Sequence, residues 1–131
     1  MKYLYLFLLY LSTLNLYAKN DAVILVYHHV SSTTPKSTSV TPKTFEKHLD
    51  YLYDNGFNVL SLDTILTAIQ EKQDLPNKSV AITFDDAYES ILSEALPLLK
   101  EKKYPFTVFV NTQSVISTYK NILTWNELKI L

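Results

Sequence analysis

Two adjacent carboxylates, Asp85 and Asp86, follow the apolar stretch 80–82 and are the residues of this sequence best suited to chemistry. Like charges this close repel each other, and each carboxylate loses hydration if its surroundings are partly closed. A metal ion, a cationic group or a shared proton compensates such a pair. Successive residues of a regular strand point to opposite faces, so both carboxylates can share one pocket only where the strand ends. The pair therefore predicts an acid–base or metal site at a strand end.

Two other interpretations of the pair stay open at this point. One aspartate could accept hydrogen bonds from the free N–H groups at the start of a following helix, although such a cap explains only one carboxylate. The pair could also be the acid and base of a glycosidase, whose carboxylates lie about 5 Å or more apart across the scissile bond. Adjacent residues fit that separation poorly, so we rank the glycosidase below a metal or acid–base site.

The elements that would position the pair alternate between strand and helix. Apolar and β-branched runs predict strands, the first of them buried on both faces, at residues 22–27, 57–60, 79–84 and 106–110. Capping signals predict helices that begin after Thr41, after Ser61 and after Thr124, and a further helix is expected at roughly residues 89–103. The first helix ends at Asn55-Gly56, the apolar face of the second carries Leu62, Ile65, Leu66 and Ile69, and Pro97 kinks or restarts the third.

This alternation predicts an α/β fold, with a parallel sheet covered by helices in a doubly wound or barrel arrangement. Ligands of such sheets collect at the carboxyl ends of the strands. His28 and His29 follow the first predicted strand and therefore share that edge with the aspartate pair. Because only one of two adjacent strand residues normally faces inward, we expect His28 to line the pocket and His29 not to. His48 is expected on the solvated surface of a helix.

Residues 1–18 have the three parts of a secretory signal peptide: a basic start, an apolar run and the small residue Ala18 at a cleavage point. The apolar run is shorter than the roughly 20 residues of a membrane-spanning helix, and an uncleaved anchor is the alternative. The chain has no cysteine, which excludes disulfides, and its net charge of −1 without a basic cluster argues against nucleic-acid binding. We expect a secreted, periplasmic or cell-envelope protein that meets the membrane only through this segment.

The stretch 80–86, Val-Ala-Ile-Thr-Phe-Asp-Asp, resembles the first motif of the polysaccharide deacetylases, the NodB-homology or carbohydrate esterase 4 family. Segments 95–100 and 105–110 are similar to the helix and strand that follow this motif in the family. The segment 26–30, Val-Tyr-His-His-Val, resembles the opening of the secreted poly-N-acetylglucosamine deacetylase branch. The resemblance implies that residues 19–131 are the N-terminal portion of a (β/α) deacetylase barrel, NodB-like and of a distorted TIM type.

The resemblance also implies roles for single residues. Asp85 matches the catalytic base of the family and Asp86 its metal-binding aspartate, while His28 and Tyr88 match the substrate pocket. The family metal is a divalent cation, usually Zn²⁺, which activates water and polarises the carbonyl while the base takes a proton. The implied reaction is hydrolysis of N-acetyl groups on an N-acetylglucosamine-containing polysaccharide, which is the expected partner.

The other two metal ligands of the family are histidines of a His-x-x-x-His motif, and no histidine follows His48 in this sequence. We therefore expect the sequence to stop before that motif, and the 131-residue chain alone to fold loosely and lack activity. The strand at 106–110 would then be an unpaired apolar edge. A second hypothesis is a non-catalytic carbohydrate-binding or partner-binding relative, or an inactive fragment. Poly-N-acetylglucosamine, peptidoglycan and chitin-like chains all remain possible polymers.

Overall fold

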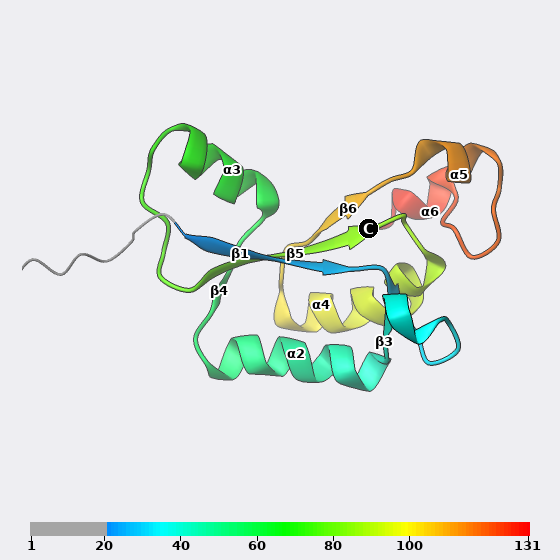
Figure 1. Cartoon of the computed structure of the whole chain (residues 1–131), viewed down its shortest axis with the longest axis horizontal. Coiled ribbons are helices and arrows are strands. Elements are labelled where there is room, and N and C mark those ends of the chain that lie inside the picture. The colour runs from blue at the N-terminus through cyan, green and yellow to red at the C-terminus, as the bar shows by residue number, and fades with distance from the viewer. Residues whose placement is uncertain (1–20) are drawn as a thin grey trace, which may run out of the picture.

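The computed structural model describes residues 21–131, and the predicted signal peptide at residues 1–18 lies outside them. Strands and helices alternate along the chain, as Figure 1 shows. The strands are β1 Ala22–Tyr27, β2 His29–Val30, β3 Ser39–Val40, β4 Asn58–Val59, β5 Ser79–Asp85 and β6 Thr107–Phe109. The helices are α2 Pro42–Asp54, α3 Leu62–Gln70, α4 Leu96–Lys102, α5 Thr112–Ile116 and α6 Trp125–Leu128, with a 3₁₀ turn η1 Lys36–Thr38 and a π-helical segment η2 Ile91–Ala95.

The main sheet is built around β5, and every strand pair in it is parallel. β1 pairs with β5 from Ser79 to Phe84. On the other side of β5, β4 pairs with its first two residues and β6 with its last three. The prediction of an α/β fold with a parallel sheet is confirmed. β2 and β3 form a separate, two-stranded parallel sheet beyond the end of β1.

Helices α2 and α4 cover one face of the main sheet (Figure 1). Val80, Ile82 and Phe84 alternate along β5 and point to that face, because side chains two residues apart share a side of a strand. They pack against a buried set from the helices and η2, namely Phe45, Leu49, Leu52, Ile91, Ala95 and Leu99. Burying an aliphatic or aromatic side chain contributes about 1.5–3 kcal/mol, so this face holds most of the folding energy.

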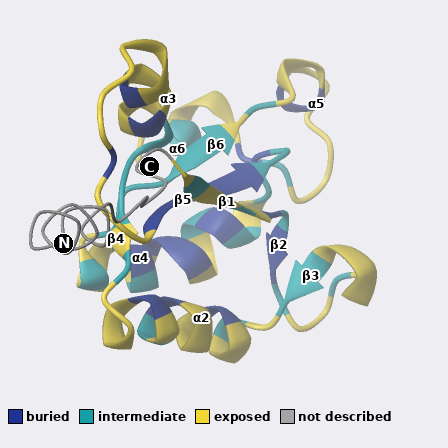
Figure 2. Cartoon of the chain, turned by 60° about the vertical axis from the view of Figure 1, so that its left-hand side comes forward, coloured by how far each residue is buried: buried dark blue, intermediate teal, exposed yellow. Residues whose placement is uncertain are grey.

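The opposite face is much less covered. Ala81 packs there in a small cluster with Ile65 and two other buried residues, whereas Ile24 and Val26 of β1 are 48% and 57% exposed. The prediction that β1 is buried on both faces is wrong, as the exposed colouring of this strand in Figure 2 also shows. Within residues 21–131, β1 pairs only with β5 and is an edge of the sheet. β6, the predicted edge, also pairs only with β5.

The capping signals place the helix ends as predicted. The side chains of Thr41 and Ser61 accept hydrogen bonds from the backbone N–H groups three residues later, at the starts of α2 and α3. Gly56 lies just after α2 with a φ of +66°, a left-handed conformation that glycine adopts without steric strain. Local sequence therefore fixes the length of α2. Among the helices of residues 21–131, none has the length and hydropathy of a membrane span.

The apolar face predicted for α3 is only partly correct. Ile65 and Ala68 are buried, but Leu66 and Ile69 are 46% and 51% exposed. Helix α3 is amphipathic, yet it meets the sheet through a narrow stripe next to β5. The pattern thus predicted the helix correctly and overestimated how much of it is covered.

The sequence predicts that Pro97 kinks or restarts the helix, and the helical geometry changes beside this residue. Residues 91–95 form η2, and α4 begins at Leu96 with Pro97 in its first turn. A proline is tolerated there because the N–H groups of a first turn have no partner within the helix. The change from π-helical to α-helical geometry therefore occurs between Ala95 and Leu96, after the whole of η2.

Candidate functional site

The aspartate pair lies where β5 ends, as predicted. Asp85 is the last residue of β5, and Asp86 and Ala87 follow with φ of +69° and +55°. This left-handed conformation costs a non-glycine residue about 1–2 kcal/mol, and consecutive occurrences mark a turn that its surroundings hold in place. The Asp86 N–H donates to the Phe109 carbonyl at 2.9 Å, and the Leu123 N–H donates to the Ala87 carbonyl at 2.9 Å. The turn ends the alternation of side-chain directions along β5. Both carboxylates therefore lie, half-buried, at the carboxyl edge of the main sheet.

His28 is the neighbour of Asp85. Its Nε2 atom lies 3.8 Å from Asp85 Oδ2, and the two side chains are 36% and 40% exposed. Tyr27 is paired with Phe84 in the register of β1 and β5, so the next residue of each strand reaches the same place. The separation exceeds a hydrogen bond, and the two groups attract when His28 carries a proton. The structure therefore brings His28 to the carboxylate pair.

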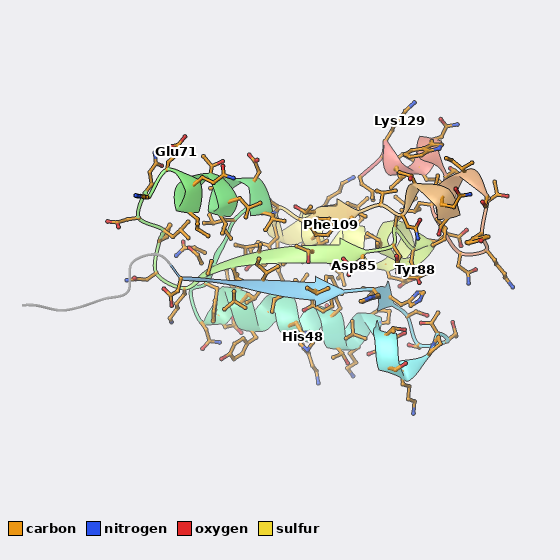
Figure 3. The ribbon with its side chains drawn as sticks, turned by 45° about the horizontal axis from the view of Figure 1, so that its top comes forward. His48, Glu71, Asp85, Tyr88, Phe109 and Lys129 are labelled. Atoms are coloured by element: carbon orange, nitrogen blue, oxygen red, sulfur yellow. The ribbon has the colours of Figure 1, made fainter. Side chains whose placement is uncertain are left out.

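Tyr88 is the neighbour of Asp86. Its hydroxyl donates to Asp86 Oδ2 at 3.4 Å, and Figure 3 shows Tyr88 beside Asp85 at the end of β5. Burial raises the pKa of Tyr88, and the charge and hydrogen bond of Asp86 raise it further. The phenol therefore stays protonated near neutral pH and remains a hydrogen-bond donor to the carboxylate.

His29 also belongs to this group of side chains, contrary to the prediction that it does not line the pocket. Its ring is 9% exposed and stacks on Tyr88, with 3.6 Å between ring centroids. Burial lowers the pKa of His29, a charged His28 lowers it further, and Asp86 opposes the shift. The expectation failed because the chain bends at His28 and His29 begins β2, so the alternation of one continuous strand does not apply.

His48 lies on α2, apart from the aspartate pair (Figure 3). It is exposed, as predicted, but its Nδ1 atom is 3.1 Å from the hydroxyl oxygen of Tyr27. Burial raises the pKa of Tyr27 to about 12. This contact belongs to the covered core and not to the candidate site.

The helix that follows the pair does not use either aspartate as its cap. The helical segment η2 begins at Ile91, its N-cap residue is Ser90, and no side chain caps it. The Ser90 hydroxyl instead accepts a hydrogen bond from the Val30 N–H at 3.2 Å. The capping interpretation of the two aspartates is therefore wrong.

Two cavities have His29 in their linings. One, of about 450 Å³, is lined by Tyr88, His29 and the segments around them, and the other, of about 350 Å³, is lined by His28 and His29. Asp85 and Asp86 do not line these cavities themselves. The pocket residues predicted from sequence, His28 and Tyr88, therefore each line a cavity next to the carboxylates.

The described residues do not fit a complete metal site. Within residues 21–131 there is no group of three histidine, aspartate or glutamate side chains that could hold a metal ion. A catalytic zinc site has three protein ligands and one open position. The pair can contribute carboxylate oxygens to such a site but does not make one with its present neighbours.

Comparison with known proteins supports the resemblance drawn from the motif. The family model for polysaccharide deacetylase matches residues 72–129, which include the aspartate pair. The poly-beta-1,6-N-acetyl-D-glucosamine N-deacetylase of Staphylococcus epidermidis is 32% identical over 116 residues, which are 78% of this chain and 40% of that protein. The chain belongs to the polysaccharide deacetylase family.

Solved structures from this deacetylase family have the same fold. IcaB from Ammonifex degensii matches with a TM-score of 0.75 and 28% identity, over 85% of this chain and 48% of that one. The Streptococcus pyogenes deacetylase PplD, in complex with acetate, matches with a TM-score of 0.73 and 27% identity, over 83% of this chain and 50% of that one. These matches confirm the predicted N-terminal part of a NodB-type barrel. The chain spans 37–40% of the length of the curated relatives that it matches.

Proposed function

We propose that the protein hydrolyses N-acetyl groups of a polysaccharide that contains N-acetylglucosamine. The observation that carries this proposal is the strained turn that brings Asp85 and Asp86 together at the end of β5, inside the segment matched by the deacetylase family model. The relative from Staphylococcus epidermidis is named for poly-beta-1,6-N-acetyl-D-glucosamine, which makes this polymer the first substrate to test.

In the proposed reaction Asp85 is the general base. It takes a proton from a water molecule whose oxygen bonds to the acetamide carbonyl carbon. The C–N bond then breaks, the amine leaves with a proton, and acetate is released. Asp85 suits this role because its side chain is 40% exposed and open to water, and His28 Nε2 lies 3.8 Å from its carboxylate.

We further propose that a divalent cation, Zn²⁺ by family resemblance, takes Asp86 as one ligand. Such an ion would polarise the carbonyl and activate water. Asp86 is free to offer an oxygen because its one hydrogen bond from a side chain, from Tyr88, is long at 3.4 Å. Since the described residues do not complete a metal site, we assign no step of the reaction to the ion.

The protein's export and domain limits are also part of the proposal. Residues 1–18 would be a signal peptide, and residues 19–131 the N-terminal part of the deacetylase domain. A secreted or envelope location would place the enzyme with an extracellular polymer. Mass spectrometry of the protein isolated from its host would show a mature N-terminus at Lys19, whereas an intact Met1 would contradict cleavage.

The alternative function is binding without catalysis, by a relative that keeps the fold. The observation that favours it is the lack of a three-ligand metal group within residues 21–131. Binding and catalysis differ in one measurable product, which is acetate.

The test incubates the full-length protein with a β-1,6-linked N-acetylglucosamine pentamer. A deacetylase releases acetate and free amine in equal amounts, and a chelator that removes divalent metal abolishes the release until Zn²⁺ is restored. New reducing ends without acetate would indicate a glycosidase. Binding of the pentamer without acetate would support the non-catalytic alternative.

A further inference from the structure

The cavity of about 450 Å³ beside Tyr88 is a polar cleft between two parts of the chain. One wall is His29 with the loop 30–34, and the other is the segment 88–94. Hydroxyl groups dominate the lining, from Ser31, Ser32, Thr33, Thr34, Ser90 and Ser93. A cleft rich in hydroxyls suits a ligand that is itself rich in hydroxyls, such as a sugar.

The π-helical segment η2 forms part of this cleft. Ser93 and Glu94 lie on η2 and line the cavity, while Ile91 and Ala95 of the same segment are buried in the core. π-helical turns are rare and occur frequently at functional sites. The core residues fix the segment in place, so its polar side chains are held toward the cleft.

An aromatic pair forms the inner end of the cleft. His29 and Tyr88 stack with 3.6 Å between centroids and both line the cavity. His29 is 9% exposed and lines both cavities described above, and no buried side-chain nitrogen or oxygen atom within residues 21–131 lacks a hydrogen-bond partner. The ring of His29 is therefore a contact surface for a ligand in the cleft.

The charge of the cleft is negative. Glu89 and Glu94 line it, and neither forms an ion pair with any residue in 21–131. The lining contains no lysine. The cleft therefore suits a sugar that carries a positive charge better than a neutral one.

We propose that this cleft binds a glucosamine unit, a sugar with a free and protonated amine, in the polysaccharide strand whose acetylated unit lies at Asp85 and Asp86. The inference rests on the proposed deacetylase function, because deacetylation generates such amines along the strand. The hydroxyls and the ring of His29 bind the sugar hydroxyls, and Glu89 and Glu94 bind the ammonium group. The cleft thus favours strands that are already partly deacetylated.

Binding of two trimers to the full-length protein tests this proposal directly. A β-1,6-linked glucosamine trimer is compared with its fully acetylated counterpart at pH 6, by calorimetry and by amide NMR shifts. We expect the glucosamine trimer to bind up to about fivefold more tightly, as for one exposed ion pair, and to lose this advantage in high salt. The shifts should centre on residues 30–34 and 88–94.

Glu94→Gln and Glu89→Gln should each reduce the preference, and the double variant should remove it. Glu101→Gln, on the exposed surface of α4, makes the same charge change away from the cleft and should leave the preference intact. Equal binding of both trimers, or a preference that survives the double variant, would overturn the proposal. Acetate release without a preference between the trimers would refute only the proposed glucosamine binding in the cleft. A preference for the glucosamine trimer without acetate release would refute only the proposed deacetylase function.

Discussion

The two faces of the sheet contain similar residues in different surroundings. On the face under α2 and α4, Ile82 is 1% exposed, while on the opposite face Ile24 of the neighbouring strand is 48% exposed. By the alternation along β5, Asp85 lies on the same side of the sheet as Ala81 and Thr83, and this side is buried along β5 but open along β1. The difference separates two tasks: the covered face stabilises the fold, and the open face with its carboxyl edge carries the candidate chemistry.

The largest predicted effect compares the same substitution on the two faces. Ile82→Ala should lower the free energy of unfolding by about 2–5 kcal/mol, because it leaves a cavity in the packed core. Ile24→Ala should lower it by less than about 1 kcal/mol, because this side chain is already half in water. Urea unfolding of both variants measures the contrast. Equal losses would show that the open face is covered in solution.

The stability that the covered face gives to the fold should also fall at alkaline pH. Burial raises the pKa of Tyr27 to about 12, so between pH 10 and 12 the unfolded chain ionises first and stability falls as pH rises. The expected loss is about 2 kcal/mol, at roughly 1.4 kcal/mol for each pKa unit. In the Tyr27→Phe variant, the free energy of unfolding should change less with pH over this range. The same slope in both proteins would contradict a buried, neutral Tyr27.

The contribution of the carboxyl edge to folding stability should depend only weakly on pH, and it should fall in acid. Burial lowers the pKa of His29, so as pH falls below about 6.5 the unfolded chain takes up the proton first. The stabilisation is present above that pH and is lost as pH falls through the pKa of the folded state. His29→Phe keeps a ring against Tyr88 and should reduce this acid sensitivity in thermal unfolding. An unchanged pH dependence would show that His29 is solvated.

Features with local signals could be predicted from the sequence. Thr41 and Ser61 each bond to backbone groups only three residues away, so a short segment is enough to place the helix start. The same holds for Pro97, whose ring geometry fixes where α4 begins. The aspartate pair was found because its residue types and its place after an apolar run are visible locally. Helix α5 was missed, although Asn111 caps it in the same way.

Features that depend on distant neighbours could not be predicted. The apolar sequence of β1 indicates a strand but not which of its faces is packed, and Val26 is exposed despite its β-branched side chain. His29 was misjudged because a two-residue strand has no periodicity from which to infer a direction. Its burial depends on Tyr88, which is 59 positions later in the sequence and reaches it only through the turn after β5.

The most direct test of the account measures acetate release and unfolding together in one pair of variants of the full-length protein. Asp85→Asn removes the proposed base, and Asp63→Asn makes the same change on exposed α3. We predict that Asp85→Asn lowers acetate release by at least about 100-fold while its unfolding free energy stays within about 1 kcal/mol of the parent. Asp63→Asn should retain full activity. Near-parental acetate release by Asp85→Asn would contradict the assignment of catalysis to the end of β5.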